Sequence, residues 1–279
     1  MNGKLYLCAT PIGNLGDITY RCVETLKSVD LIAAEDTRRT LGLLNHLDIE
    51  KPLTSYFEHN KKEKGEYLIS EMRNGKSIAL VSDAGTPAVS DPGEDLVKMC
   101  IEAGIDVVPV PGAVAGINAL ISSGFSTQRF TFEGFLTVNK RGRTEHLKAL
   151  SDEQRTMIFY EAPHKLLSTL RDMLSVLGDR RIALCREITK IHEEFVRTTI
   201  SEAINKYEEN PPRGEFVLVI EGKKSEEIEA EREALWQKMS VSEHVEMYKK
   251  QGIEEKEALK KVAKDRGVSK REIYNEYKV

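Results

Sequence analysis

Short apolar runs alternate with helix-like segments along the first 110 residues of the chain. Apolar runs of four or five residues predict buried strands, and apolar residues spaced three or four apart predict amphipathic helices. The pattern predicts strands at 5–9, 31–34, 78–81 and 107–110, and helices at 18–29, 40–47, 67–72 and 94–103. This order is typical of a parallel sheet with helices on both faces.

A run of small residues at 111–116 predicts a turn that opens a helix at 117–121, after which a second set of strands begins. Strands are predicted at 130–132, 157–160, 182–186, 195–199 and 216–220, with helices at 166–177 and 201–207. Because no helix separates 182–186 from 195–199, the second sheet is predicted to be mixed. We therefore expect two α/β domains, at 1–120 and 121–224.

Beyond Gly222 the chain becomes rich in Lys and Glu with helical spacing, which predicts a small helical module at 225–279. Gly267 resembles the turn glycine of a helix-turn-helix, and Ser269 with Glu272 forms a capping-box pattern. Residues 256–278 hold 8 basic and 4 acidic side chains, a local positive excess that suits phosphate. A solvated helical hairpin or a dimer arm explains the same pattern equally well.

Composition narrows the possible partners. The formal charge is −4, so no global basic field attracts nucleic acid, and contacts with RNA must come from local patches. No apolar run approaches the roughly 20 residues that span a bilayer, and the start lacks a signal-peptide core, so a cytoplasmic protein without membrane contact is expected. The 4 cysteines are scattered, which predicts buried thiols and no metal site.

The segment 81–93 follows the predicted strand 78–81 and carries small residues between two turn signals. Loops at the carboxyl ends of parallel strands bind ligands, and small residues let a ligand approach the backbone. An ordinary strand-to-helix connection is the alternative, although most such connections span only about 2–6 residues. The glycine-bearing segment 10–17 after the first strand matches neither GxGxxG nor a P-loop, which argues against a dinucleotide or a nucleoside triphosphate.

Ionisable residues follow three predicted strands. Glu35, Asp36 and Arg38 end the second strand, where a carboxylate could accept a proton and a guanidinium could grip phosphate. Capping of the next helix by Asp36 or Thr37 is the structural alternative. Further ionisable residues follow the strands 157–160 and 182–186, although solvated surface charge accounts for most such groups: Glu161, His164, Arg186, Glu187, Lys190, His192 and Glu194.

Six segments in order resemble the tetrapyrrole methylase superfamily, and within it the branch that methylates a cytidine 2'-hydroxyl in bacterial 16S rRNA. They are 9–17, 34–38, 82–93, 159–164, 186–190 with 192–194, and 213–216. The segment 111–116 departs from the family, which usually has Pro-Gly-Pro-Ser/Cys-Ala there, but Ala113 and Val114 remain small. The resemblance covers nearly the whole chain.

The resemblance implies two α/β domains with the cofactor S-adenosylmethionine bound in a cleft between them, and usually a homodimer. It also implies 16S rRNA in the small ribosomal subunit as partner, with the decoding-region cytidine (C1402 in conventional rRNA numbering) as target. It further implies which residues contact the cofactor. Their chemistry suits this role, since Asp83 can accept a hydrogen bond from the cofactor and Ala115 with Ile117 can form an apolar surface for its adenine. The contacts are Pro11, Ile12, Asp83, Thr86, Val114, Ala115, Tyr160, Gly214, Glu215 and Phe216.

Methyl transfer to a ribose hydroxyl needs alignment and a group that removes the proton. Glu35, Asp36 and Arg38 are the first candidates for this group, and Glu161, Glu187 and Lys190 the second. Two other functions stay open. One is methylation of a small tetrapyrrole, which gives no use to a basic tail, and the other is RNA binding without catalysis, which predicts salt-sensitive affinity without methyl transfer.

Overall fold

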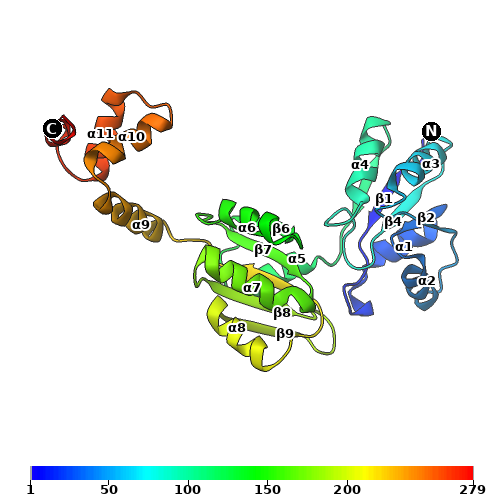
Figure 1. The fold of residues 1–279 in the computed structure, drawn as a ribbon. Helices are drawn as coiled ribbons and strands as arrows, with labels where there is room; N and C mark the ends of the chain where they lie inside the picture. The colour runs from blue at the N-terminus through cyan, green and yellow to red at the C-terminus, as the bar shows by residue number, and fades with distance from the viewer. Residues whose placement is uncertain (1, 279) are drawn as a thin grey trace. The chain divides into compact units, whose positions relative to one another are not determined.

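The first sheet of the computed structural model, which describes residues 2–278, is parallel throughout, as predicted (Figure 1). Its strand order is β3-β2-β4-β1-β5. The strands are β1 (Leu5–Cys8), β2 (Leu31–Ala34), β3 (Leu53–Ser55), β4 (Ile78–Val81) and β5 (Val107–Val110). β3 was not predicted, because an edge strand of 3 half-buried residues carries almost no periodic signal.

Helices cover both faces of this sheet. Leu68 and Leu96 of α3 and α4 pack with Leu5 and Leu80 in one core cluster, whereas Leu26 and Leu44 of α1 and α2 pack with Ile32 in another. The elements are α1 (Tyr20–Ser28), α2 (Thr37–His46), α3 (Lys61–Arg73), α4 (Gly93–Glu102) and a short 3-10 helix, η1 (Leu15–Asp17). Since neighbouring strands run in parallel, the loops after β1, β2 and β4 all leave from one edge of the sheet.

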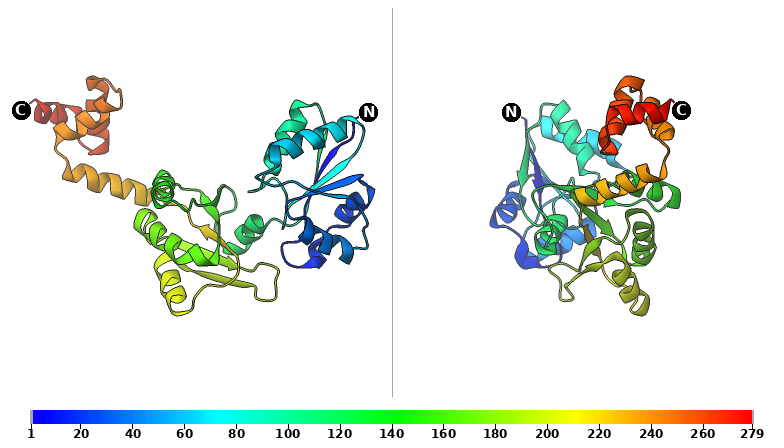
Figure 2. Two further views of the ribbon diagram at one scale, coloured as in Figure 1. Left: turned by 45° about the vertical axis from the view of Figure 1, so that its right-hand side comes forward. Right: turned by 90° about the vertical axis from the view of Figure 1, so that its left-hand side faces the viewer.

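The second sheet is mixed, as predicted: β6 and β7 are parallel and the other pairs antiparallel, in the order β6-β7-β10-β8-β9. α5 packs on one face, and α6, α7 and α8 lie on the other (Figure 2). The strands are β6 (Phe130–Phe135), β7 (Thr156–Glu161), β8 (Arg181–Arg186), β9 (Glu194–Thr199) and β10 (Phe216–Ile220). The helices are α5 (Ala115–Ser123), α6 (Lys140–Ala149), α7 (Pro163–Leu177) and α8 (Ile200–Glu209).

Two local predictions on this sheet can be compared with the structure. Pro163 stands at the first position of α7, where its missing N–H costs no hydrogen bond, as expected. α6 was not predicted, because it buries only Arg143 and Leu147 and so lacks an apolar stripe. The 4 cysteines are buried free thiols, as expected.

Contacts divide the chain into two compact units, one of residues up to 150 and 155–221, the other of residues 151–154 and 222 onward. The second unit contains α9 (Ser225–Lys238), α10 (Val241–Lys250), α11 (Glu255–Asp265) and α12 (Lys270–Tyr277). Val245, Leu259 and Ile273 belong to its core. Ser269 and Glu272 form the predicted capping box of α12. The predicted domain limits stay predictions, and none of the helices that the structure describes could cross a bilayer.

Candidate functional site

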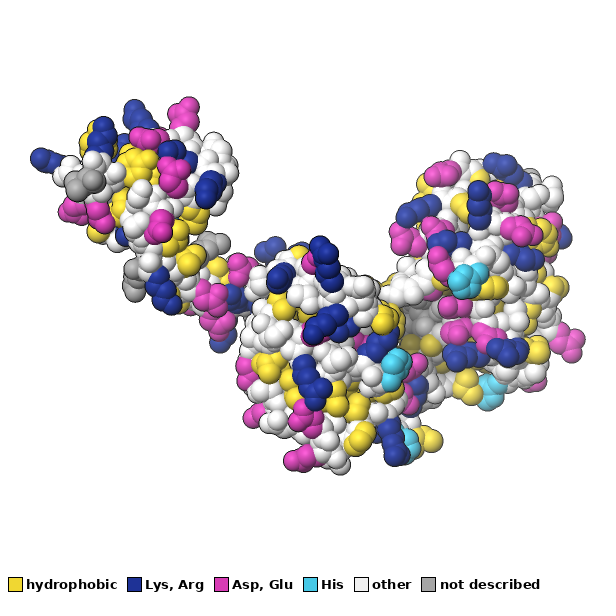
Figure 3. All heavy atoms as spheres, in the orientation of Figure 1, with side chains coloured by type: hydrophobic (Ala, Val, Ile, Leu, Met, Phe, Trp, Pro, Cys, Tyr) yellow, Lys and Arg dark blue, Asp and Glu magenta, His cyan; other side chains and the backbone are white. Residues whose placement is uncertain are grey.

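A cavity of about 570 Å³ lies within the first unit, a volume in the range of small-molecule sites. Loops that follow β1, β2, β4 and β5 supply one wall, and β7, β8, β10 and their loops supply the other. Figure 3 shows acidic, basic and histidine side chains beside a hollow in the surface of the protein. The lining residues are Ile12, Glu35, Arg39, 82–86, 89–91, Val114, Ala115, Phe135, 160–164, Cys185, Glu187, Ile188, Lys190 and 215–217.

The loop between β4 and α4 is held in an unusual conformation by Asp91. One oxygen of its carboxylate accepts from the amides of Ala88 and Gly93 at 2.9 and 2.8 Å, and the other accepts from the amide of Val89 at 3.3 Å. Ala88 and Ser90 have φ of 65° and 66°, which is costly for residues with a Cβ. These three hydrogen bonds offset that cost and fix the loop at the cavity wall.

Gly85 is needed for close approach in the same loop. Its φ is 82°, and a Cβ there would lie 3.0 Å from Ile12 and 3.2 Å from the carbonyl oxygen of Ala113. Thr86 donates its hydroxyl to that same carbonyl at 3.1 Å. The loops after β1, β4 and β5 therefore pack on one another with almost no spare room, which makes this wall of the cavity rigid.

Most of the predicted cofactor contacts line the cavity. Those that do are Ile12, Asp83, Thr86, Val114, Ala115, Tyr160, Glu215 and Phe216. Pro11 lines a neighbouring pocket instead, and Gly214 is absent from the lining. Ile117, expected beside Ala115, is 41% exposed and does not line the cavity. Ile117 follows Ala115 by two residues on α5, a rotation of about 200° around the helix axis, so its side chain points to another side than that of Ala115. The roles of all these residues stay predictions.

Tyr160 joins the two walls of the cavity. Its hydroxyl oxygen accepts a hydrogen bond from the amide of Gly116 at 3.1 Å, and its ring packs edge-on against Phe132 and Phe135. Burial raises the pKa of the Tyr160 hydroxyl, despite the bond from Gly116. Tyr160 is therefore a fixed, neutral aromatic wall at any physiological pH.

Glu35 is the acidic side chain of the cavity whose pKa is shifted upward. Burial raises the pKa of its carboxyl, and the nearby charges of Asp83 and Asp91 raise it further. The backbone of Asp83 and the charge of Arg39 act in the opposite direction. A carboxylate with a raised pKa accepts a proton more readily at neutral pH than an ordinary one.

Asp83 holds the rim beside Glu35. One oxygen of its carboxylate accepts from the amide of Asp36 at 3.0 Å, and the other lies 3.1 Å from the Arg39 guanidinium. Arg39 therefore places a positive charge at the cavity rim, where sequence analysis expected Arg38.

Asp36 and Arg38 do not line the cavity. Asp36 caps α2 by accepting from the amide of Arg38 at 2.9 Å, which is the structural alternative foreseen for it. The Arg38 side chain is 91% exposed and pairs with the same carboxylate at 3.0 Å. Hydrogen bonds from Arg38 lower the pKa of Asp36 to about 2. The geometry gives these two residues a local role at the start of the helix.

This placement predicts a contrast between neighbouring residues. Arg38→Ala and Asp36→Asn are expected to change turnover by no more than about twofold, the effect typical of surface substitutions. Asp36→Ala should lower the melting temperature, because α2 loses its cap, whereas Asp36→Asn should not. Turnover and thermal unfolding of the three variants check this, and a large loss of turnover in Arg38→Ala would contradict it.

The second group of candidates forms two separate arrangements. Glu161 is buried, and its carboxylate accepts from the amide of Ala162 at 2.8 Å and from the hydroxyl of Thr169 at 2.6 Å. The bond from Thr169 ties the end of β7 to α7, and the bond from Ala162 fixes the turn between them. Glu161 therefore serves the fold at the cavity wall.

Glu187 and Lys190 form an ion pair that holds the opposite rim. The Lys190 ammonium lies 3.0 Å from Glu187 and 2.9 Å from Glu215. Burial opposes the charge of Lys190, but the hydrogen bonds to both carboxylates raise its pKa above the ordinary value. Burial likewise opposes the charge of Glu187, but the amide of Glu215 and Lys190 lower its pKa. Both groups stay charged at neutral pH, which makes either a poor proton acceptor.

Sequence reasoning missed two functional positions, Arg39 and Asp91. The pattern at 35–39 contained the signal for Arg39, since two successive arginines on a helix point in different directions, about 100° apart. Asp91 was part of the predicted ligand loop, but the three hydrogen bonds that it accepts from backbone amides depend on an irregular turn. Such a turn leaves no periodic pattern in the sequence. Among the described residues no three His, Cys, Asp or Glu side chains gather as a metal site would require.

Solved structures with the same fold include a uroporphyrin-III C-methyltransferase and a diphthine synthase. Uroporphyrin-III C-methyltransferase from Thermus thermophilus superposes with a TM-score of 0.57 at 19% identity, over 78% of this chain and 94% of that one. Diphthine synthase superposes with a TM-score of 0.62 at 12% identity, over 80% and 91%. At such identities the likeness establishes the fold alone.

Sequence comparison gives the family. The tetrapyrrole (corrin/porphyrin) methylases match residues 4–204. Proteins named ribosomal RNA small subunit methyltransferase I are 52% identical in Halalkalibacterium halodurans and 53% identical in Bacillus subtilis, each over 99% of this chain and 94% of the relative. The chain therefore belongs to the tetrapyrrole methylase family, and within it to the group formed by these ribosomal RNA small subunit methyltransferase I proteins.

Proposed function

We propose that this chain transfers a methyl group from S-adenosylmethionine to the 2'-hydroxyl of a ribose in 16S rRNA, at the decoding-region cytidine. The observation that carries the proposal is the identity of about half of all positions, over nearly the full length, with relatives whose name states small subunit rRNA methylation. The cytoplasm, where ribosomes work, is the corresponding location.

The residues of the cavity suit this donor. Ile12, Val114 and Ala115 offer apolar contact for an adenine ring, and Ala84 with Gly85 exposes bare backbone to it. Asp83 already accepts from Arg39 and from an amide, but each carboxylate oxygen has a second lone pair for a ribose hydroxyl or an amino group. Another solved structure of the T. thermophilus uroporphyrin-III enzyme, with a TM-score of 0.57, is a complex with S-adenosylhomocysteine, the demethylated donor.

Bound S-adenosylmethionine supplies an electrophilic methyl group on a sulfonium. The chain's own task is to align the ribose hydroxyl and remove its proton. Glu35 fits the second task, because it lines the cavity and burial raises its pKa toward the pH at which the enzyme works. Arg39 places a guanidinium at the same rim, where it can hold a phosphate of the RNA or stabilise negative charge on the attacking oxygen.

The basic residues of the helical module are proposed to add RNA affinity. Lys261 and Lys264 are exposed on α11, Arg271 is exposed on α12, and Lys278 is exposed directly after α12. Contacts of this kind bind phosphate without reading sequence and weaken steeply with salt. A homodimer is proposed as well, because large apolar side chains are exposed on α5 and β6, namely Ile117, Ile121, Phe130 and Phe132.

One experiment tests the proposed function. Small ribosomal subunits from a strain that lacks this chain are incubated with the purified protein and methyl-labelled S-adenosylmethionine, and the modified nucleotide is mapped. Naked 16S rRNA and a tetrapyrrole precursor serve as parallel substrates. Label at the 2'-oxygen of the decoding-region cytidine is expected. Label in the tetrapyrrole alone, or RNA binding without methyl transfer, would contradict the proposal.

A further inference from the structure

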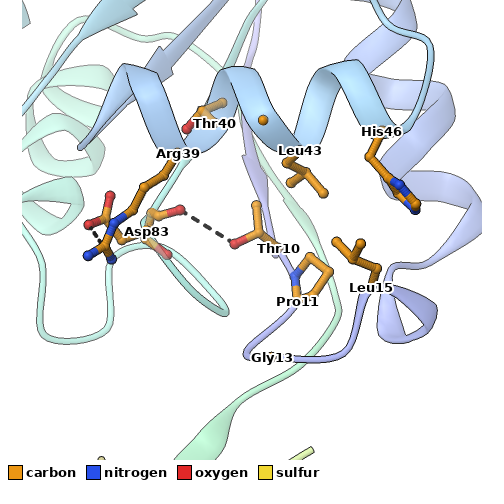
Figure 4. Close-up of a pocket in the computed structure, with 11 residues that line it drawn as sticks. Thr10, Pro11, Gly13, Leu15, Arg39, Thr40, Leu43, His46 and Asp83 are labelled. Carbon is orange, nitrogen blue, oxygen red and sulfur yellow. Dashed lines mark hydrogen bonds and ion pairs between the residues drawn. The ribbon is translucent and has the colours of Figure 1, made fainter. Parts of the chain in front are cut away.

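A second hollow of about 320 Å³, here called the α2 pocket, lies between α2 and the segment 10–15 (Figure 4). Pro11, Leu15 and Leu43 give it apolar walls, and Arg39 and His46 stand toward opposite ends of the helix. Thr10 is buried and donates its hydroxyl to the carbonyl oxygens of Ser82 and Gly85, both at 3.4 Å. The pocket is therefore apolar in the middle, with an imidazole at one end and, at the other, a guanidinium paired with Asp83 at 3.1 Å.

The α2 pocket shares a wall with the cavity described above. Arg39, Ser82 and Asp83 line both. In a nucleotide the base is joined to the carbon next to the one that carries the 2'-hydroxyl. When a 2'-hydroxyl enters the cavity near Glu35, its base must lie a few ångströms away, in a space that adjoins the cavity. The α2 pocket is such a space, and its volume exceeds that of a pyrimidine ring.

We propose that the α2 pocket binds the base of the nucleotide whose ribose is methylated. The inference rests on the proposed function and adds to it the site that selects the nucleotide. The base leaves the stack of the RNA, as bases do when proteins bind them singly. It then lies against the apolar side chains of Leu15 and Leu43 and against the backbone of α2. Arg39 at one end faces a flanking phosphate, whose charge its guanidinium complements, and the imidazole of His46 offers a hydrogen bond at the other end.

Gly42 supports this assignment. It lines the pocket in the middle of α2, although glycine in a helix interior is unfavourable relative to alanine. A Cβ at this position would meet no atom of the protein within 4 Å. The fold therefore does not require a glycine here, and a bare helix backbone at this point leaves room for a ligand.

Gly42 also provides the test, because a larger side chain fills the pocket without a clash in the protein. Gly42→Leu is expected to lower kcat/KM for small subunits at least about tenfold, the equivalent of 1.4 kcal/mol. Gly42→Ala should cause a smaller loss and raise the melting temperature. Calorimetry should give both variants the wild-type Kd for S-adenosylmethionine. Asn45→Leu, which adds the same side chain to α2 outside the pocket, is the matched control and should behave as wild type.

The possible results separate the two claims. A wild-type protein that transfers no methyl to rRNA overturns the proposed function and this inference with it. Normal turnover by the wild type together with kcat/KM of Gly42→Leu within twofold of it overturns the inference alone. The inference also fails when Gly42→Leu weakens S-adenosylmethionine binding as much as it lowers kcat/KM, since the pocket then belongs to the donor.

Discussion

Glu35→Gln is expected to lower the rate of methyl transfer by about a hundredfold or more, the contribution typical of a general base. Glutamine keeps the shape of the side chain but cannot accept the proton of the ribose hydroxyl. The wild-type rate should rise with pH as Glu35 ionises, and this rise should be centred above the ordinary carboxyl pKa of 4.5, because burial, Asp83 and Asp91 raise the pKa. In the variant this rise of the rate at acid pH, the acid limb of the pH profile, should disappear.

The same substitution should stabilise the fold at neutral pH. Since the pKa of Glu35 is higher in the folded chain than in the unfolded one, the folded state binds its proton more tightly, and ionisation of Glu35 costs stability above the folded pKa. Glutamine removes that cost. The gain in melting temperature should therefore be present at neutral pH and vanish below about pH 4.5, where the carboxyl is protonated in both states.

Single-turnover methylation of small subunits and thermal unfolding, each across a pH series, measure both effects. Glu161→Gln is the matched control, because that buried carboxylate lines the cavity but is bonded to α7. It should lose stability without losing the acid limb of the wild-type pH profile. Full turnover in Glu35→Gln would remove this residue from the mechanism.

Asp91→Ala is expected to weaken S-adenosylmethionine binding by about a hundredfold. The substitution removes the hydrogen bonds that the carboxylate accepts from the backbone amides of Ala88, Val89 and Gly93. These hydrogen bonds hold Ala88 and Ser90 at positive φ. Because they offset the strain of the loop, loss of about 3 kcal/mol leaves roughly one chain in a hundred ready to bind. The apparent Kd rises by the reciprocal of that fraction, about a hundredfold.

Calorimetric titration with S-adenosylmethionine measures the effect, and Asp91→Asn supplies the control. Asparagine retains the one oxygen that accepts from Ala88 and Gly93, so its Kd should fall between those of the wild type and Asp91→Ala. Removal of the Asp91 charge should also lower the pKa of Glu35 and move the acid limb of the rate profile to lower pH. Equal Kd values for wild type and Asp91→Ala would show that the loop plays no part in binding the donor.

Local sequence was sufficient for much of the fold. Buried four-residue runs predicted the central strands of the first sheet, and the missing helix between 182–186 and 195–199 predicted that the second sheet is mixed. Pro163 at the start of α7 and the capping box at Ser269 follow from contacts between residues one to three positions apart. Such features are decided by neighbours in the chain, so the sequence alone contains them.

The tertiary structure decided which ionisable residues share the cavity. The segment 35–39 contains two acidic residues and two arginines, and the sequence does not distinguish the members of each pair. The fold turns Glu35 and Arg39 to the cavity and leaves Asp36 and Arg38 at the cap of α2. Glu35 and Asp36 precede the helix, and Asp36 is turned to its cap. Arg38 and Arg39 are successive residues of α2 and so differ by a rotation of about 100°, and the side that faces a ligand depends on how the helix packs on the sheet. Long-range packing sets that rotation, which is why sequence identified the segment and only the folded chain identified the residues.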